Sequence, residues 1–113
     1  MEVEFATQKL AKVCNSQKQL IRKYGERTAG LIRECLDDLA AVERLADLRA
    51  LPHHRCHELH GNRKGEFSLD LVHPYRLIFV PGNKPIPRLP DGGIDWAAVT
   101  AVVVTGVENT HGK

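Results

Sequence analysis

The sequence predicts an α+β fold in which an N-terminal strand and a helical hairpin pack on a small antiparallel sheet. Apolar residues recur at helical spacing between positions 10 and 42. The period becomes alternating after Pro52, and a β-branched run at 101–107 suits a central strand. Helices followed by strands are typical of the α+β class. With 113 residues, we expect one domain spanning 1–113 with a single modest core.

The first half of the chain predicts a strand and two helices. Residues Glu2 to Phe5 alternate polar and apolar side chains, as a short strand does. Thr7 is a suitable N-cap for a first helix that ends at Gly25. A second amphipathic helix is expected from near Thr28 towards Ala46, which completes a helical hairpin.

The second half predicts strands, because its apolar residues alternate and Gly and Pro interrupt the pattern. Four prolines make the segment 81–93 unsuitable for a central strand, so we expect a stiff exposed loop there. The expected elements are a short strand at 57–59, a strand at 67–72, a turn at 73–74, a strand at 76–80, the loop 81–93, one helical turn at 95–96 and a strand at 101–107.

Charge is unevenly distributed, although the formal net charge is only +2. The first predicted helix is basic and the second is acidic. A basic helix face is either a solvated surface or a stripe that faces phosphates, and the sequence leaves both interpretations open. The basic residues are Lys9, Lys12, Lys18, Arg22 and Lys23, and the acidic residues are Glu34, Asp37, Asp38, Glu43 and Asp47.

The cysteines and the N-terminus indicate a cellular compartment. Cys14, Cys35 and Cys56 are odd in number and evenly spread, which predicts buried free thiols rather than a disulfide framework. The first residues have neither a basic start nor an apolar run, so we expect no secretory signal and no membrane anchor. A cytoplasmic protein is expected.

Three segments resemble one protein family. They are His57-Glu58-Leu59-His60-Gly61-Asn62-Arg63-Lys64-Gly65-Glu66-Phe67-Ser68, then Tyr75-Arg76-Leu77-Ile78-Phe79, and finally Glu108-Asn109-Thr110-His111. Together with the order of elements, they resemble HigB-like toxins of the RelE/ParE superfamily, which act in type II toxin-antitoxin systems for plasmid maintenance. Asn109, Thr110 and His60 stand where such chains often place an aspartate, a tyrosine and a lysine.

The resemblance implies a RelE-like fold and a metal-independent endoribonuclease that cuts messenger RNA on the ribosome and inhibits translation. In that family the ribose 2′-hydroxyl attacks the adjacent phosphate. By position, Arg76 matches the arginine that stabilises the phosphate, and an arginine fork suits two phosphate oxygens. His57 and His111 match histidines, and they are the candidates for proton transfer because imidazole titrates near neutrality.

The same resemblance implies the partners and the RNA-binding residues. The predicted RNA-binding set comprises Arg63, Lys64, His60, Lys9 and Lys12, whose cations would contact the RNA backbone. The expected partners are messenger RNA, the ribosome and a cognate antitoxin resembling a helix-turn-helix, HigA-like protein. Neither a cofactor nor a membrane is expected.

The same residues allow three other interpretations: a metal site, a hydrolase triad and a solvated arginine. His53, His54, Cys56, His57 and His60 form the densest cluster of potential ligands, but their spacing fits no standard zinc motif, so no metal site is predicted. A triad of Ser68, Asp70 and His73 lacks the nucleophile elbow. Arg76 could instead be a solvated strand arginine that is paired with Asp70 or Glu66.

Two other functions use the same fold. The chain could act by binding alone, as a gyrase-poisoning ParE-like toxin or a catalytically silent relative, for which proton-transfer residues are unnecessary. It could also be the antidote, since chains of this kind are sometimes labelled killer suppression proteins. The strand-rich C-terminal half favours the toxin over a helix-turn-helix antidote.

Overall fold

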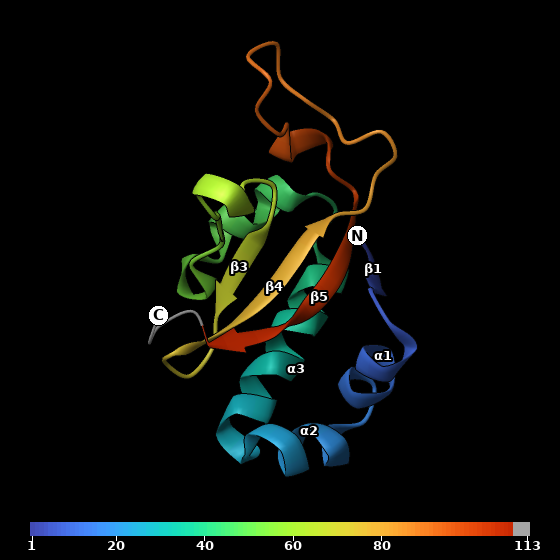
Figure 1. The fold of residues 1–113 in the computed structure, drawn as a ribbon, viewed down its shortest axis with the longest axis vertical. Helices are drawn as coiled ribbons and strands as arrows, with labels where there is room; N and C mark the ends of the chain where they lie inside the picture. The colour runs from blue at the N-terminus through green and yellow to red at the C-terminus, as the bar shows by residue number, and fades with distance from the viewer. Residues whose placement is uncertain (110–113) are drawn as a thin grey trace.

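The computed structural model describes residues 1–109 and has a five-stranded mixed sheet with α3 packed on one face (Figure 1). The strand order is β1-β5-β4-β3-β2. The α+β class is confirmed, but the purely antiparallel sheet is wrong, because β1 runs parallel to β5. The strands and α-helices are β1 (Glu2–Phe5), α1 (Gln8–Cys14), α2 (Gln17–Tyr24), α3 (Glu26–Ala41), β2 (His57–Glu58), β3 (Phe67–Asp70), β4 (Tyr75–Pro81) and β5 (Ala101–Asn109).

The predicted first helix is broken into α1 and α2. Thr7 caps α1 as expected, since its Oγ1 accepts a hydrogen bond from the Leu10 amide at 3.1 Å. Ser16 starts a second helix, because its Oγ accepts a hydrogen bond from the Gln19 amide at 3.2 Å. A serine that satisfies a free amide in this way favours a new helix N-terminus over a continuous helix.

The second predicted helix is α3, which begins at Glu26 and ends at Ala41, earlier than expected at both ends. Gly25 has a φ of 86°, so it turns the chain sharply between α2 and α3. At the other end, the Met1 ammonium group donates hydrogen bonds to the carbonyls of Leu39, Ala40 and Val42. A positive charge at the C-terminus of a helix satisfies free carbonyls and complements the helix dipole.

Strand β5 contains a bulge that reverses its alternation. Ile78 pairs with Gly106 and Phe79 pairs with Val104, so Thr105 is an extra residue. Its hydroxyl donates a hydrogen bond to the Ile78 carbonyl at 3.2 Å. Because of the extra residue, Glu108 lies on the opposite face from Val104, although both positions are even-numbered.

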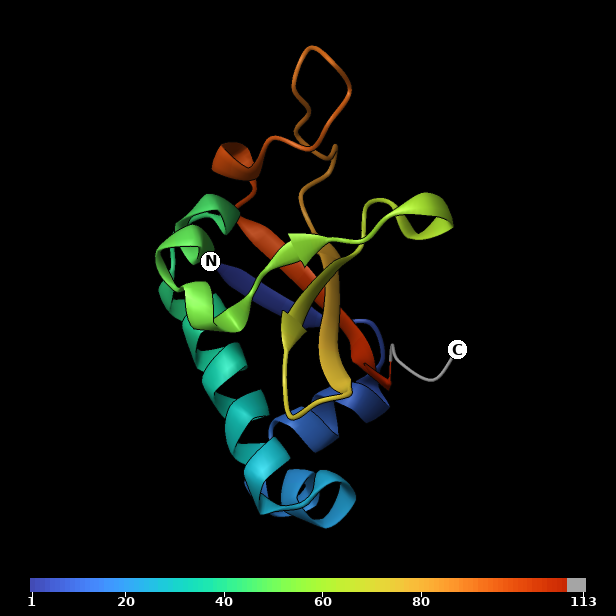
Figure 2. The ribbon, with the colours of Figure 1, turned by 90° about the vertical axis from the view of Figure 1, so that its left-hand side faces the viewer.

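The core lies between α3 and one face of the sheet, as the side view shows (Figure 2). Phe67 and Phe79 stack with their ring centroids 5.6 Å apart, and Trp96 meets Phe67 edge-on at 5.1 Å. Such aromatic pairs add specific geometry to the burial of apolar area. The α3 residues that face this core are Ala29, Ile32, Cys35, Leu36 and Leu39.

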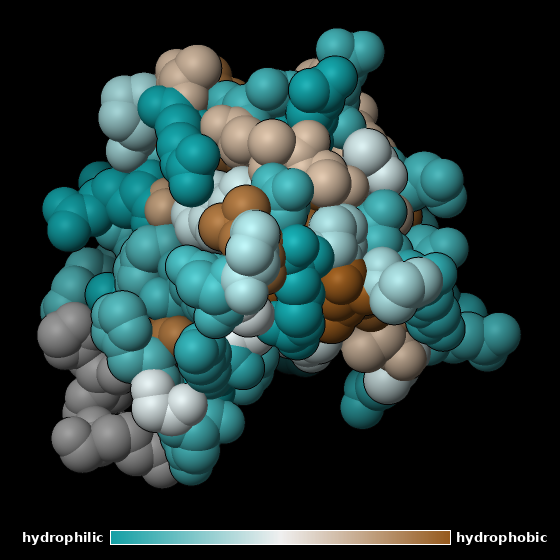
Figure 3. Space-filling view, turned by 90° about the horizontal axis from the view of Figure 1, so that it is seen from above, coloured by the Kyte–Doolittle hydropathy of each residue, from teal (hydrophilic) through white to brown (hydrophobic). Residues whose placement is uncertain are grey.

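The remaining segments are 3₁₀ turns and loops. The turns are η1 (Leu45–Ala50), η2 (Pro52–His54), η3 (Gly61–Arg63) and η4 (Trp96–Ala98), so the helical turn expected at 95–96 starts at Trp96 with Asp95 as its cap. Pro81 closes β4, and most of the following loop is exposed as predicted. Seen from the end that carries this loop, hydrophobic side chains form separate patches among hydrophilic ones (Figure 3).

The thiols are free, as predicted: Cys14 and Cys35 are buried, while Cys56 is half-buried. Burial raises the pKa of Cys35 and of Cys56 to about 12, so both are protonated at neutral pH. None of the helices within residues 1–109 is both long and apolar enough to cross a membrane.

We expect Ser16→Ala to destabilise the protein by about 1 kcal/mol, because it leaves the Gln19 amide without its acceptor. Urea unfolding followed by circular dichroism measures the change. Gln17→Ala, in the exposed first turn of α2, is the control and should change the free energy of unfolding by less than about 0.5 kcal/mol. Equal effects of the two substitutions would contradict the capping role.

Candidate functional site

The face of the sheet that α3 leaves open carries the polar side chains of the strands. Residues paired across neighbouring strands share a face, so the strand register defines two rows. The first row contains His57, Ser68, Ile78 and Gly106, and the second contains Asp70, Arg76 and Glu108. The view in Figure 1 looks onto this face, with α3 behind the sheet.

Arg76 lies in the middle of the second row, as expected for a strand arginine. Its side chain is 27% exposed, and its Nε lies 3.5 Å from Asp70 Oδ1. Arg55 approaches the other oxygen of Asp70 at 3.3 Å. Within residues 1–109, the buried Asp70 Oδ1 accepts no hydrogen bond. The Arg76–Asp70 contact is therefore a loose ion pair, because 3.5 Å is long for a hydrogen bond.

His57 is held by the backbone in one tautomer. Its Nδ1 lies 3.0 Å from the Arg55 carbonyl, which can only accept a hydrogen bond, so Nδ1 carries the proton in the neutral ring. Its Nε2 is then an acceptor and lies 3.5 Å from Ser68 Oγ. Such a histidine can take up a proton at Nε2. Ser68 is fully buried and contacts His57, which leaves the Ser68-Asp70-His73 triad without support.

The two described catalytic candidates share a face but are not adjacent. His57 lies on β2 and Arg76 on β4, two strands and two residues apart. Standard strand spacings place their Cα atoms about 12 Å from each other. The third candidate, His111, lies outside the described residues. The structure thus brings Arg76 and His57 to one surface of the sheet, with Ser68 and Asp70 of β3 between them.

The Arg63 side chain spans the open face between Glu66 and Glu108, and we call it the Arg63 strap. It donates four hydrogen bonds of 2.7–3.0 Å, two to Glu66 and two to Glu108. Arg63 lies in η3, which follows β2, and Glu108 lies in β5 at the other side of β3 and β4, so this side chain connects segments from the two sides of these strands. Ile78, which lies on this face, is fully buried. The hydrogen bonds raise the pKa of Arg63 and lower that of Glu66.

The other predicted RNA-binding residues lie in separate places. Lys64 lines a groove of about 250 Å³ together with Glu58 and Arg88. His60 is exposed and precedes η3. Lys9 lines a groove of about 260 Å³ that reaches Thr105 of β5, and Lys12 lines a different hollow on α1 and α2. Lys64, Lys9 and Lys12 therefore line three different hollows instead of one continuous groove.

Sequence reasoning missed most of the carboxylates of this site. Asp70 was expected as one possible partner of Arg76, and this pairing is confirmed, whereas Glu66 pairs with Arg63. The role of Glu108 depends on the bulge in β5, which no sequence pattern revealed. Three arginines and three carboxylates balance on the open face, namely Arg55, Arg63 and Arg76 with Glu66, Asp70 and Glu108.

No protein-family profile, curated protein or solved structure matches this chain.

The ion pair between Arg63 and Glu66 makes the free energy of unfolding depend on pH. The pKa of Glu66 lies below its usual 4.5, so the stabilisation is complete above about pH 4.5 and is lost as pH falls through the lowered value. We expect Glu66→Gln to lower the free energy of unfolding at about pH 7 by about 1 kcal/mol, and the difference from wild type to shrink in acid.

Urea unfolding across this pH range measures the effect. Glu43→Gln removes an exposed carboxylate elsewhere and should leave the profile unchanged. A difference between Glu66→Gln and wild type that stays constant with pH would contradict the assignment.

Proposed function

We propose that this protein is the toxin of a type II toxin-antitoxin pair, a ribosome-dependent endoribonuclease that cleaves messenger RNA and inhibits translation in the cytoplasm. The observation that carries the proposal is the placement of Arg76 and His57 on the same helix-free face of the sheet. This surface holds a guanidinium that is only loosely paired and an imidazole with an acceptor nitrogen. Both groups suit phosphate chemistry near neutral pH.

The proposed reaction is attack of a ribose 2′-hydroxyl on the neighbouring phosphorus. His57 Nε2 takes the hydroxyl proton as the new P–O bond forms. Arg76 stabilises the charge on the phosphorane oxygens through its two-pronged guanidinium. The bond to the 5′-oxygen then breaks, and this oxygen takes a proton from a general acid, for which His111 is the candidate. The products are a 2′,3′-cyclic phosphate and a 5′-hydroxyl.

RNA binding would use cations at both ends of the open face. Lys64 and His60 lie at the β2 end, and Lys9 and Lys12 lie on α1. Arg63 would exchange a carboxylate of Glu66 or Glu108 for a phosphate, so substrate entry and opening of the strap would be coupled. A helix-turn-helix, HigA-like antitoxin would neutralise the toxin by covering this face.

A second candidate is a protein of the same type that acts by binding alone, as a gyrase-poisoning toxin or a silent, killer suppression partner. The charge balance on the open face favours it, because Arg63 is fully engaged by two carboxylates. A surface with no excess of cations attracts RNA only weakly.

The test is induced expression of wild type, Arg76→Ala and His57→Ala, with growth and primer-extension mapping of transcripts. We expect growth arrest with codon-phased cuts for wild type, and a loss of about 100-fold or more in cleavage rate for each variant, because each removes a group that acts in the transition state. Arg27→Ala, an exposed arginine at the start of α3, is the control and should retain cleavage.

The outcomes separate the two candidates. Arrest without RNA cuts would indicate the binding function. Unchanged cleavage by Arg76→Ala or His57→Ala, measured with equal amounts of folded protein, would contradict the assignment of that residue.

A further inference from the structure

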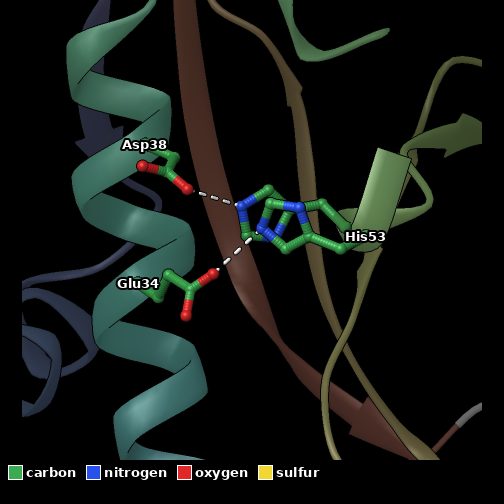
Figure 4. Close-up of side chains that lie close together, drawn as sticks. Glu34, Asp38 and His53 are labelled. Atoms are coloured by element: carbon green, nitrogen blue, oxygen red, sulfur yellow. Dashed lines mark hydrogen bonds and ion pairs between the residues drawn. The ribbon is translucent and has the colours of Figure 1, made fainter. Parts of the chain in front are cut away.

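Four side chains with metal-ligating atoms converge between α3 and η2. Glu34 and Asp38 are four residues apart on α3 and therefore project from the same side of the helix. His53 and His54 follow Pro52 on η2. Figure 4 shows the two carboxylates directed from α3 towards the histidine side chains. We propose that these four residues form a binding site for a divalent transition metal ion, for which Zn²⁺ is the representative.

The distances between the ligand atoms suit one small ion. One ligating atom from each residue lies within 4.8 Å of those from the other three. His54 Nε2 lies 2.7 Å from Asp38 Oδ2, and His53 Nε2 lies 3.0 Å from Glu34 Oε2. Tetrahedral zinc with bonds of about 2.0 Å separates its ligand atoms by about 3.3 Å. Displacements of the ligand atoms by about 1 Å, through side-chain rotation, would therefore complete the site.

The burial of the four residues supports a site that is anchored on one side and accessible on the other. The side chains of His53 and Glu34 are 55% and 48% exposed, so they can move to meet an ion. His54 is only 3% exposed, and its Nδ1 lies 3.6 Å from Cys35 Sγ. Without an ion, Nε2 donates a hydrogen bond to Asp38. With an ion bound at Nε2, the ring proton would lie on Nδ1 and be donated to Cys35 Sγ.

The charge of the site and the type of its ligand atoms determine which metal ion it would prefer. The ion pairs of Glu34 and Asp38 are both with histidines. Two carboxylates with two neutral imidazoles leave a charge of about −2, which a divalent cation offsets. Imidazole nitrogens favour Zn²⁺, Ni²⁺ or Cu²⁺ over Mg²⁺ and Ca²⁺, which prefer all-oxygen sites.

The site would be structural, because four protein ligands complete a tetrahedral shell and leave no position for a substrate. A bound ion would clamp η2 to α3. His57 follows His54 by three residues, so the clamp would also restrain the start of β2. This inference does not depend on the proposed RNA cleavage, since none of the four residues is among those proposed to bind or cleave RNA.

The experiment uses the full chain, without an affinity tag and stripped of metals with a chelator. Zn²⁺ is titrated in competition with a chromophoric chelator, and Co²⁺ is added separately as a spectroscopic probe. We expect one ion per chain, strong visible absorption of tetrahedral Co²⁺, and a higher Tm with Zn²⁺. Glu34→Gln and His53→Gln change exposed side chains, so they should fold normally and weaken Zn²⁺ binding by about 100-fold or more.

Two control variants are matched to the ligands. Asp37→Asn alters the adjacent carboxylate, which pairs with Arg33, and His73→Gln alters a histidine in the turn between β3 and β4. Both should bind Zn²⁺ as the wild type does. Absence of Zn²⁺ binding by the wild type, or equal affinity in Glu34→Gln and His53→Gln, would overturn the proposal and leave two histidine–carboxylate pairs at this place.

Discussion

The parallel pairing of the first strand with the last is the constraint on which the rest of the fold depends. Through β1 and β5, residues at the two ends of the described chain enter one sheet, and the Met1 ammonium then caps the carbonyl end of α3. This anchors α3 across one face, where its apolar side buries Phe67 and Phe79. Within residues 1–109, no α-helix covers the opposite face, and the candidate site lies there.

Electrostatic balance is the second feature of this face. Each of its arginines meets a carboxylate, but the pairs differ in strength. Arg63 makes four short hydrogen bonds, whereas Arg76 has one ion pair at 3.5 Å with a carboxylate oxygen that accepts no hydrogen bond within residues 1–109. Under the proposed function, Arg76 would give up fewer hydrogen bonds than Arg63 when it exchanges its carboxylate for a phosphate.

Helix α3 serves two different surfaces. Its apolar side packs on the sheet, and its acidic side presents Glu34 and Asp38 to the histidines of η2. In the sequence, this acidity is only a general property of the predicted helix, and the histidines fit no standard zinc spacing. Their partners are instead residues about 16–19 positions earlier, which only the packing of η2 on α3 brings close.

The sequence by itself determined the α+β class, most strand positions, the cap at Thr7 and the free thiols, because these depend on local periodicity, capping chemistry and composition. Only the tertiary structure decided the parallel β1–β5 pair and the face on which Glu108 lies. These depend on contacts between distant segments and on a one-residue bulge, which alternation cannot reveal. Arg76 and His57 were named as candidates because their segments resemble a family, whereas the Arg63 strap reaches from η3 to β5 and needs the tertiary structure.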